Sequence, residues 1–327
     1  MLKRTTSELR VDFTNHAPIC DVCGGRGLEP KGAVRLHDGP YANSRSRPLR
    51  RVFVCKQCGH MSVDLYEPDR YQEYYRGLSA DYHICHDQER WRYEKIMALL
   101  PRTGVRKVLD VGCGSGTFLA SFSPSVERFG IELSAAAGES AKARGIQLLP
   151  YDALTLPPYR HSFDLVTAID VVEHTKDLSQ LREHFANALK AGGKLILLTG
   201  DGDSRTAKAL GRYWYYCHYA EHITFFSARS VQRWLESEFC DIQVYPTSHH
   251  PLTPAEFVTL ARIWLLFPAK LALSKVPYLT TNAYAALWAR RDHMFVCATR
   301  RGEGVHPYQE IDDSRPPAIG AGTCENA

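Results

Sequence analysis

Apolar and polar positions alternate in blocks through the middle of the chain, between residues 105 and 200. Five short apolar runs, each of a length typical of a buried strand, are separated by segments with apolar residues at helical spacing. The runs are 105–111, 126–131, 146–149, 163–169 and 194–199. Strands that alternate with helices predict a parallel, doubly wound α/β sheet, and continuous apolar runs are typical of strands buried on both faces.

Helix signals stand between these runs. Ser134 is a good N-cap for a helix that runs to Arg144, and residues 177–190 form an amphipathic helix closed by two glycines. A helical pattern opens at Ser115, and residues 88–100 predict a helix that lies against the sheet. Two further apolar segments complete a predicted seven-stranded, mostly parallel sheet: 241–245 and 294–299.

A long insertion, 246–292, separates the last two strands. Its apolar part, 257–273, is broken by Pro268 and carries two lysines. We expect a helical lid over an acceptor; the alternative is an interfacial helix that touches a membrane peripherally and suits a lipid-linked acceptor. No apolar run is long enough to span a bilayer. Residues 301–327 are rich in Gly, Pro and charge and predict a disordered tail.

Composition favours a globular protein with one sizeable core. The 327 residues are 44% hydrophobic and 23% charged, and the net charge of +4 is too small to argue for nucleic acid by itself. Because the first 19 residues lack an apolar segment, no secretory signal is expected and a cytoplasmic location is predicted. Oligomeric state stays open.

The ten cysteines include two matching knuckles, Cys20-x-x-Cys23-Gly and Cys55-x-x-Cys58-Gly. Two residues between thiolates let one tight turn present both sulfurs to the same ion, and the following glycine allows a positive φ. Two such turns predict a closed, structural zinc site in a small zinc-ribbon domain. Two disulfides or a redox pair are the alternatives.

Basic residues lie between the knuckles. They form either a solvated loop or a clamp for a phosphorylated acceptor or for RNA. They are Lys31, Arg35, Arg45, Arg47, Arg50 and Arg51. The tyrosines that follow, at 71, 74 and 75, either line an acceptor site or pack the ribbon on the main domain.

The first strand of the sheet ends in a glycine-rich turn, Asp110-x-Gly112-x-Gly114-x-Gly116. Glycines let the backbone bend sharply and let a ligand approach it closely. The second strand ends at Glu132, twenty positions beyond Gly112, where a carboxylate can accept from both ribose hydroxyls of a nucleoside. A turn that only joins strand to helix, and an NAD site, are the alternatives.

This stretch resembles motif I of class I S-adenosylmethionine (SAM)-dependent methyltransferases, with a Rossmann-like fold. The resemblance implies that Asp110 faces the ammonium end of SAM, that Glu132 binds the ribose and that Asp152 accepts from the adenine amino group. It extends over residues 105–200. The implied cofactor-binding set is Asp110, Gly112, Cys113, Gly114, Gly116, Glu132, Leu133, Asp152, Ala153 and Asp170.

An aromatic run, 213–222, follows the fifth strand and holds Tyr219, Glu221 and His222. Loss of a proton from a hydroxyl or a carbon acid needs a base, and histidine has a suitable pKa. Tyr219-x-Glu221-His222 resembles a motif of zinc-ribbon C-methyltransferases that act on nucleotide-linked sugars, but the large C-terminal domain of those enzymes has no room here. His222 is the first candidate base and His174, beside Glu173, the second; structural bracing is the alternative for both pairs.

Together these features predict a zinc ribbon (1–66), a linker and packing helix (67–104), a SAM-binding domain (105–300) and a tail. The predicted function is methyl transfer to a small-molecule acceptor, such as a sugar or natural-product intermediate, at oxygen, carbon or nitrogen. The fourth strand tip lacks the Asn/Asp-Pro-Pro-aromatic pattern of enzymes that methylate base amino groups. An RNA methyltransferase whose ribbon binds RNA is the first alternative; a binding protein with a silent methyltransferase fold is the second.

Overall fold

The computed structural model describes residues 19–36, 39–41, 48–78, 90–100, 104–155, 157–210, 214–247 and 292–302. Most of the predicted lid and tail, and Arg45 and Arg47 of the basic loop, lie outside this part of the chain. The fold divides into two compact units. The N-terminal unit comprises Met1–Tyr75, Gly200–Ala228 and Pro246–Met294, and the sheet unit comprises Arg76–Thr199, Arg229–Tyr245 and Phe295–Ala327.

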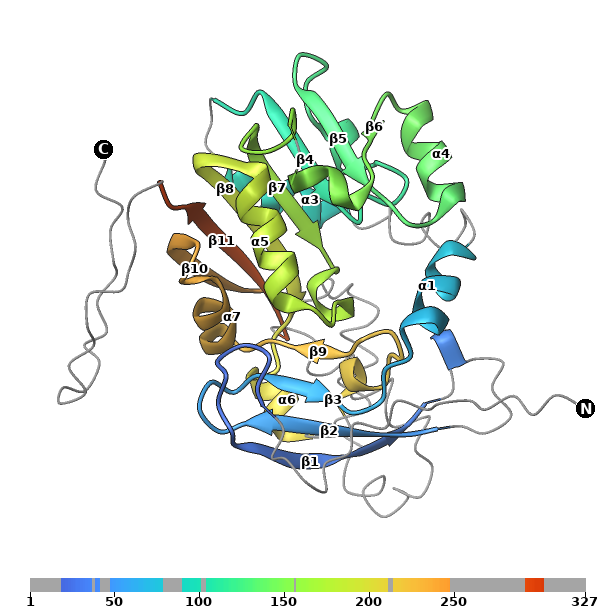
Figure 1. Ribbon diagram of the computed structural model, residues 1–327, viewed down its shortest axis with the longest axis vertical. Helices are drawn as coiled ribbons and strands as arrows, with labels where there is room; N and C mark the ends of the chain where they lie inside the picture. Colours follow the sequence, from blue (N-terminus) through green and yellow to red (C-terminus); the bar gives the residue numbers. More distant parts are fainter. Residues whose placement is uncertain are drawn as a thin grey trace, which may run out of the picture. The chain divides into compact units, whose positions relative to one another are not determined.

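The sheet unit is built on a seven-stranded sheet with the order β10-β11-β8-β7-β4-β5-β6 (Figure 1). The pairs β4–β5, β4–β7, β5–β6 and β7–β8 are all parallel, so the predicted doubly wound sheet is confirmed. Its strands are β4 (Lys107–Val111), β5 (Glu127–Ile131), β6 (Gln147–Leu148), β7 (Phe163–Ile169), β8 (Leu189–Gly200), β10 (Phe239–Thr247) and β11 (His293–Arg300).

Helices cover this sheet and begin where the sequence predicts. The Ser134 side chain accepts a hydrogen bond from Ala137 N–H at the start of α4, and Asp177 accepts one from Gln180 N–H at the start of α5. Helix α4 packs beside β6 and α5 beside β7 (Figure 1). The helices are α3 (Arg90–Leu99), α4 (Ala135–Ala143), α5 (Leu178–Ala188) and α7 (Ala228–Leu235). No helix among the described residues is both long and apolar enough to cross a membrane.

Two local predictions for the sheet unit are wrong. The helix expected from Ser115 is only a short 3₁₀ turn, Leu119–Ser121. Gly116 has a positive φ of +80°, and Pro124 disfavours helix at the residue before it, so too few residues remain for an α-helix. The helix expected to reach Lys190 ends at Ala188, because Leu189 already pairs with Phe163 in the parallel ladder.

The N-terminal unit holds an antiparallel sheet with the order β1-β2-β3-β9. Three strands come from the first 63 residues, but the fourth comes from far along the chain, after the last parallel crossover. The strands are β1 (Leu28–Arg35), β2 (Leu49–Cys55), β3 (Met61–Val63) and β9 (Thr224–Phe225), and the helices α1 (Pro68–Arg76) and α6 (Arg205–Leu210) accompany them.

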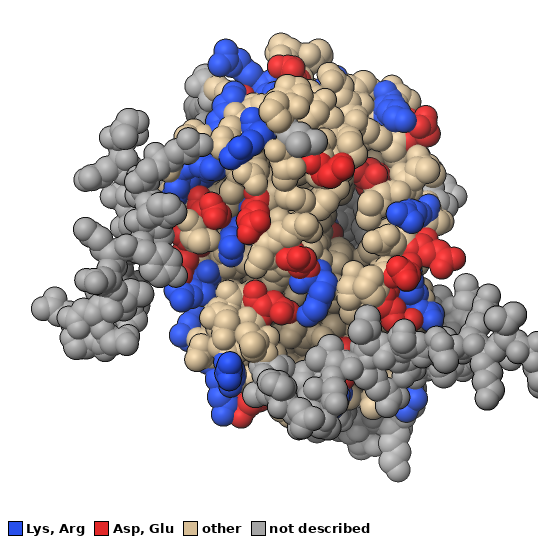
Figure 2. Space-filling view, viewed as in Figure 1, with Lys and Arg blue, Asp and Glu red and all other residues tan. Residues whose placement is uncertain are grey.

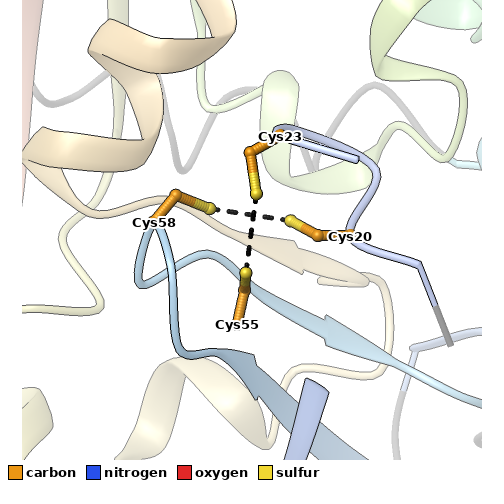
Figure 3. Close-up of side chains that lie close together, drawn as sticks. All are labelled: Cys20, Cys23, Cys55 and Cys58. Atoms are coloured by element: carbon orange, nitrogen blue, oxygen red, sulfur yellow. Dashed lines mark hydrogen bonds between the residues drawn. The ribbon is translucent and has the colours of Figure 1, made fainter. Parts of the chain in front are cut away.

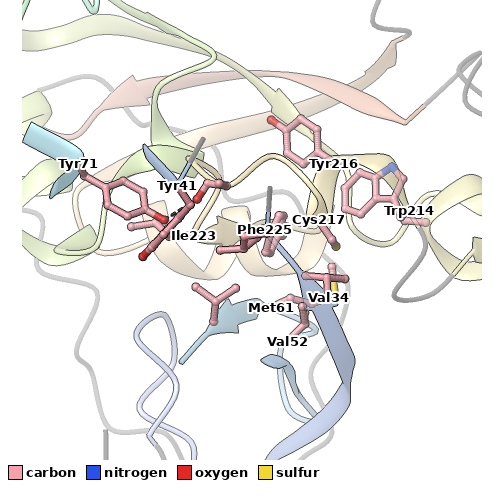
Figure 4. Close-up of a cluster of buried hydrophobic side chains, with 14 residues drawn as sticks. Val34, Tyr41, Val52, Met61, Tyr71, Trp214, Tyr216, Cys217, Ile223 and Phe225 are labelled. Atoms are coloured by element: carbon pink, nitrogen blue, oxygen red, sulfur yellow. Dashed lines mark hydrogen bonds between the residues drawn. The ribbon is translucent and has the colours of Figure 1, made fainter. Parts of the chain in front are cut away.

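One hydrophobic core joins the first two segments of the N-terminal unit, Met1–Tyr75 and Gly200–Ala228. Side chains from the early strands and from residues 214–225 point toward one another, among them Val52, Met61, Trp214 and Phe225, and all four are buried (Figure 4). Residues 200–228 therefore pack with the cysteine-bearing segment, whereas the sequence predicts them as part of the SAM-binding domain. The predicted domain boundaries stay a prediction.

Candidate functional site

The glycine-rich turn follows β4 and is built from positive-φ glycines. Gly112, Gly114 and Gly116 have φ angles of +75°, +54° and +80°, a region that favours glycine. The amides of Gly112 and Cys113 donate to the carbonyl of Ile131 at 2.8 and 3.0 Å. A Cβ on Gly112 would stand 2.5 Å from a Val171 methyl carbon, so no larger residue fits there without a shift.

Asp110 lies beneath this turn at the carboxyl end of β4. Its side chain is buried, and Oδ1 accepts a hydrogen bond from Thr167 Oγ1 at 2.6 Å. Burial raises the pKa of Asp110 to about 7, although the Thr167 hydroxyl opposes that shift. A desolvated carboxylate at a strand tip is suited to an arriving cation, such as an ammonium group.

Glu132 stands at the tip of the neighbouring strand and is held by backbone amides. Gly114 N–H donates to Oε2 at 2.8 Å and Ser134 N–H donates to Oε1 at 2.7 Å. Each carboxylate oxygen has a second lone pair, so both can accept a further hydrogen bond. Leu133 beside it is 55% exposed, which leaves an apolar surface for a flat ligand.

Two more predicted cofactor residues follow β6 and β7. Asp152 and Ala153 lie in the 3₁₀ helix Tyr151–Thr155, with Asp152 exposed and Ala153 buried. Asp170 has a positive φ of +52° and pairs with the buried Arg92 of α3. Because parallel strands end at the same edge of a sheet, the tips of β4, β5, β6 and β7 bring the predicted set together.

Glu173 and His174 occupy a 3₁₀ turn, Val172–His174, just beyond β7. Glu173 is fully buried and accepts a hydrogen bond from Thr199 Oγ1 at 2.9 Å, whereas His174 is half-buried. The bond to Thr199 links the turn to β8, which agrees with the bracing role considered for this pair.

The candidate acceptor residues belong to the N-terminal unit, in a segment that we call the acceptor loop, residues 217–222. Tyr219 is 42% exposed, while Glu221 and His222 are buried. The Nδ1 atom of His222 lies 3.0 Å from the carbonyl oxygen of Tyr216, and its ring contacts the rings of Tyr216 and Tyr219. The Glu221 carboxylate lies over Gly39, where any Cβ would clash with it.

The four knuckle cysteines converge on one point (Figure 3). Their sulfurs all lie within 4.8 Å of one another, with 3.6 Å between Cys20 and Cys58 and between Cys23 and Cys55. Gly24 and Gly59 adopt the predicted positive φ, +70° and +75°. Sulfurs about 2.3 Å from a central zinc would be spaced in this way, so the donor set fits a tetrahedral metal site.

The charges in this cluster also suit a cation. The hydrogen bond between Cys20 and Cys58 lowers the pKa of Cys20 to about 5 and raises the pKa of Cys58. One thiolate therefore disfavours a second thiolate beside it, and a divalent ion among the four sulfurs would stabilise them together.

Comparison with known proteins finds a family match that covers much of the sheet unit and residues 200–228 of the N-terminal unit. Residues 83–238 match a family model described as a methyltransferase domain. This match indicates a methyltransferase domain over these residues. It is 27% identical over 158 residues to a demethylmenaquinone methyltransferase of Lactococcus lactis, covering 43% of this chain and 62% of that protein. It is 33% identical over 200 residues to a tRNA U34 carboxymethyltransferase of Shewanella woodyi, covering 55% and 54%.

A crystal structure of geranyl diphosphate C-methyltransferase from Streptomyces coelicolor is also similar, at 16% identity and a TM-score of 0.42, covering 64% of this chain and 75% of that one. The chain spans between half and two thirds of the length of the demethylmenaquinone methyltransferase and the tRNA U34 carboxymethyltransferase named above.

Sequence reasoning missed three polar or aromatic residues around the methyltransferase domain and the acceptor loop. Arg92 pairs with Asp170, and Tyr216 packs its ring 4.0 Å, centroid to centroid, from that of His222. Arg50 is fully buried and donates to the acceptor loop. The apolar spacing of residues 88–100 predicts a packing helix and does not single out Arg92. Arg50 stands among several basic residues between the knuckles, and no pattern distinguishes it from them. No local signal predicts a contact 170 residues along the chain.

Proposed function

We propose that this protein is a SAM-dependent methyltransferase that acts on a small-molecule acceptor. The observation that carries the proposal is the pair of carboxylates at adjacent strand tips around a positive-φ glycine turn, Asp110 and Glu132. Their setting within a methyltransferase domain supports the same assignment.

The strand tips offer a complementary surface for each part of SAM. Asp110 would pair with the ammonium, Glu132 would accept from the ribose hydroxyls, and Leu133 would cover the adenine ring. Asp152 would accept from the adenine amino group. Bound SAM supplies an activated methyl group on a sulfonium, so the protein has to position the acceptor in line with it and remove a proton where the acceptor carries one.

His222 is the proposed base. The carbonyl of Tyr216 can only accept a hydrogen bond, so the contact at 3.0 Å places the proton of the neutral ring on Nδ1. Nε2 is then the basic nitrogen and would take the proton from the acceptor. Tyr219, partly exposed on the same loop, would contact the acceptor, and Glu221 would orient the loop.

Two observations bear on the class of acceptor. On the face shown in Figure 2, acidic side chains lie among the basic ones, and the net charge of the chain is only +4. A modest net charge favours a small molecule over a polynucleotide. The relative named demethylmenaquinone methyltransferase supports the same choice. RNA is the second candidate, favoured by the relative named tRNA U34 carboxymethyltransferase.

We further propose that the cysteine cluster holds a structural zinc ion. Four sulfur donors at tetrahedral spacing leave no open position for chemistry. The ion would therefore stabilise the fold of the N-terminal unit.

The experiment that tests the function uses methyl-labelled SAM. The protein is incubated with a small-molecule extract and, separately, with total RNA, and the label is followed into each fraction. We expect label in the small-molecule fraction. Label confined to RNA would replace the first proposal with the second, and label in neither fraction, although SAM binds, would contradict both.

A further inference from the structure

Arg50 lies on β2 of the cysteine-bearing sheet, yet its donors reach the acceptor loop. Nη1 donates to the carbonyl of Ala220 at 2.9 Å, and Nη2 donates to the carbonyls of Cys217 and Tyr219 at 2.6 and 3.1 Å. The side chain is fully buried. A buried guanidinium is costly unless its N–H groups are satisfied. Three main-chain oxygens of one loop accept hydrogen bonds from both Nη atoms, while Nε has no partner among the described residues.

Other residues from the first segment of the N-terminal unit also contact this loop. The hydroxyl of Tyr71, on α1, donates to the carbonyl of Ala220. Gly39, with a φ of +53°, leaves the space that the Glu221 carboxylate occupies. The loop has little regular structure of its own, so these neighbours define its path.

The chain that leaves the loop is tied to the second cysteine knuckle. Ser62 of β3 pairs with Thr224 of β9, and the ring of His60 lies 3.4 Å from the Thr224 hydroxyl. The hydroxyl of Ser227 donates to the carbonyl of Cys58 at 3.3 Å. Arg50 of β2 contacts Cys217 at the start of the acceptor loop, and β3 pairs with β9 just after the loop ends. Both ends of the loop are therefore anchored to the cysteine-bearing sheet.

We infer that Arg50 is a positioning residue for methyl transfer, and that the cysteine-bearing sheet holds the backbone of the acceptor loop in place. The inference rests on the function proposed above. Arg50 touches no reacting atom; it fixes the backbone that carries Tyr219 and His222. A displacement of about 1 Å at a reacting group can cost about 100-fold in rate. Loss of the hydrogen bonds from Arg50 to the loop should therefore reduce turnover.

The test compares Arg50→Met with Arg51→Met in the full-length protein. Arg51 is next on the same strand but points outward, pairing with Asp64, and its side chain is 51% exposed. The readouts are hydrogen exchange of residues 214–227, affinity for SAM, and transfer of labelled methyl to the small-molecule fraction.

We expect Arg50→Met to raise exchange in the loop at least tenfold and to lower the transfer rate about 10- to 100-fold, with SAM affinity within about twofold of the parent. Arg51→Met should resemble the parent in all three. If Arg50→Met shows the same hydrogen exchange in the loop and the same transfer rate as Arg51→Met, the inference is overturned. If the parent protein itself transfers no label, the proposed function fails, which is a distinct result.

Two further variants keep the test informative if Arg50→Met does not fold. Tyr71→Phe removes one donor to Ala220 and keeps the ring, so transfer should fall about 2- to 10-fold. Arg50→Ala should regain transfer when millimolar guanidinium is added, because the ion can occupy the vacated site. Unchanged transfer in Tyr71→Phe together with no rescue of Arg50→Ala would contradict a positioning role.

Discussion

The Nδ1 atom of His222 lies 3.0 Å from the main-chain oxygen of Tyr216. Six positions apart in sequence, the two residues are also in ring contact. The carbonyl fixes the orientation of the imidazole and assigns its proton to Nδ1, so Nε2 is the nitrogen that can act as a base. This one contact makes a specific catalytic role for His222 testable.

His222→Ala should reduce turnover far more than SAM affinity. A positioned general base contributes about 10²–10⁴-fold to rate, whereas the predicted SAM-binding residues lie on the sheet unit. The check is to measure rate, SAM affinity and melting temperature on the same sample.

A structural brace would behave differently from a base. In that case His222→Ala would melt earlier and lose rate and stability together. Turnover near that of the parent in a stable variant would remove His222 from catalysis. The same set of measurements on His174→Ala would then show whether the base lies at the tip of β7 or whether positioning alone is enough.

About one zinc ion per chain should copurify with the protein. Cys58→Ser removes one of four sulfurs, so we expect loss of metal and of order in the N-terminal unit while SAM still binds. Cys297→Ser, which alters a cysteine of β11 outside the cluster, is the control. Elemental analysis that finds no metal in protein with reactive cluster thiols would refute the zinc assignment.

Gly112→Ala should be more damaging than Gly192→Ala, although both glycines have a φ of +75°. The left-handed conformation costs about 1–2 kcal/mol for alanine at either position. At Gly112 the new Cβ also meets Val171 at 2.5 Å, whereas nothing lies within 4 Å at Gly192, so overpacking adds about 1–3 kcal/mol there. Equal free energies of unfolding for the two variants would contradict the close-approach argument.

SAM affinity should rise with pH up to about 7, the value to which burial raises the pKa of Asp110. An ammonium group pairs with the ionised carboxylate, so binding at lower pH must release a proton, and affinity falls up to about tenfold per pH unit. The same shift has the opposite effect on the unliganded fold: the native state holds the extra proton, so stability declines as pH rises from about 4 to about 7. A pH profile in Asp110→Asn that still follows the parent would remove Asp110 from this role.

Much of the sheet unit could be predicted because its signals are local. The strand expected at 163–169 coincides with β7, Ser134 caps its helix as expected, and the helix expected from Asp177 begins at Leu178. Apolar runs and N-caps are decided by neighbouring residues, so periodicity finds them. Where a longer-range constraint competes, as in the ladder pairing of Leu189 with Phe163, the predicted boundary is wrong.

The acceptor loop shows why the rest could not be predicted. Its candidate residues were found by type, but their surroundings come from segments far away in the chain: Arg50 from β2, Tyr71 from α1, and β3 through its pairing with β9. A buried cation that binds main-chain oxygens leaves no sequence pattern, because carbonyl groups are present at every residue.

The measurement that tests the account most directly is a calorimetric titration of SAM into the parent protein, Glu132→Ala and Glu127→Ala. Both acids belong to the β5 segment, but Glu127 is exposed at its far end. We predict that SAM binds the parent, that Glu132→Ala weakens binding by about 1–3 kcal/mol because hydrogen bonds to a charged acceptor are lost, and that Glu127→Ala is unchanged. No SAM binding by the parent, or equal affinity in a folded Glu132→Ala protein, would contradict the account.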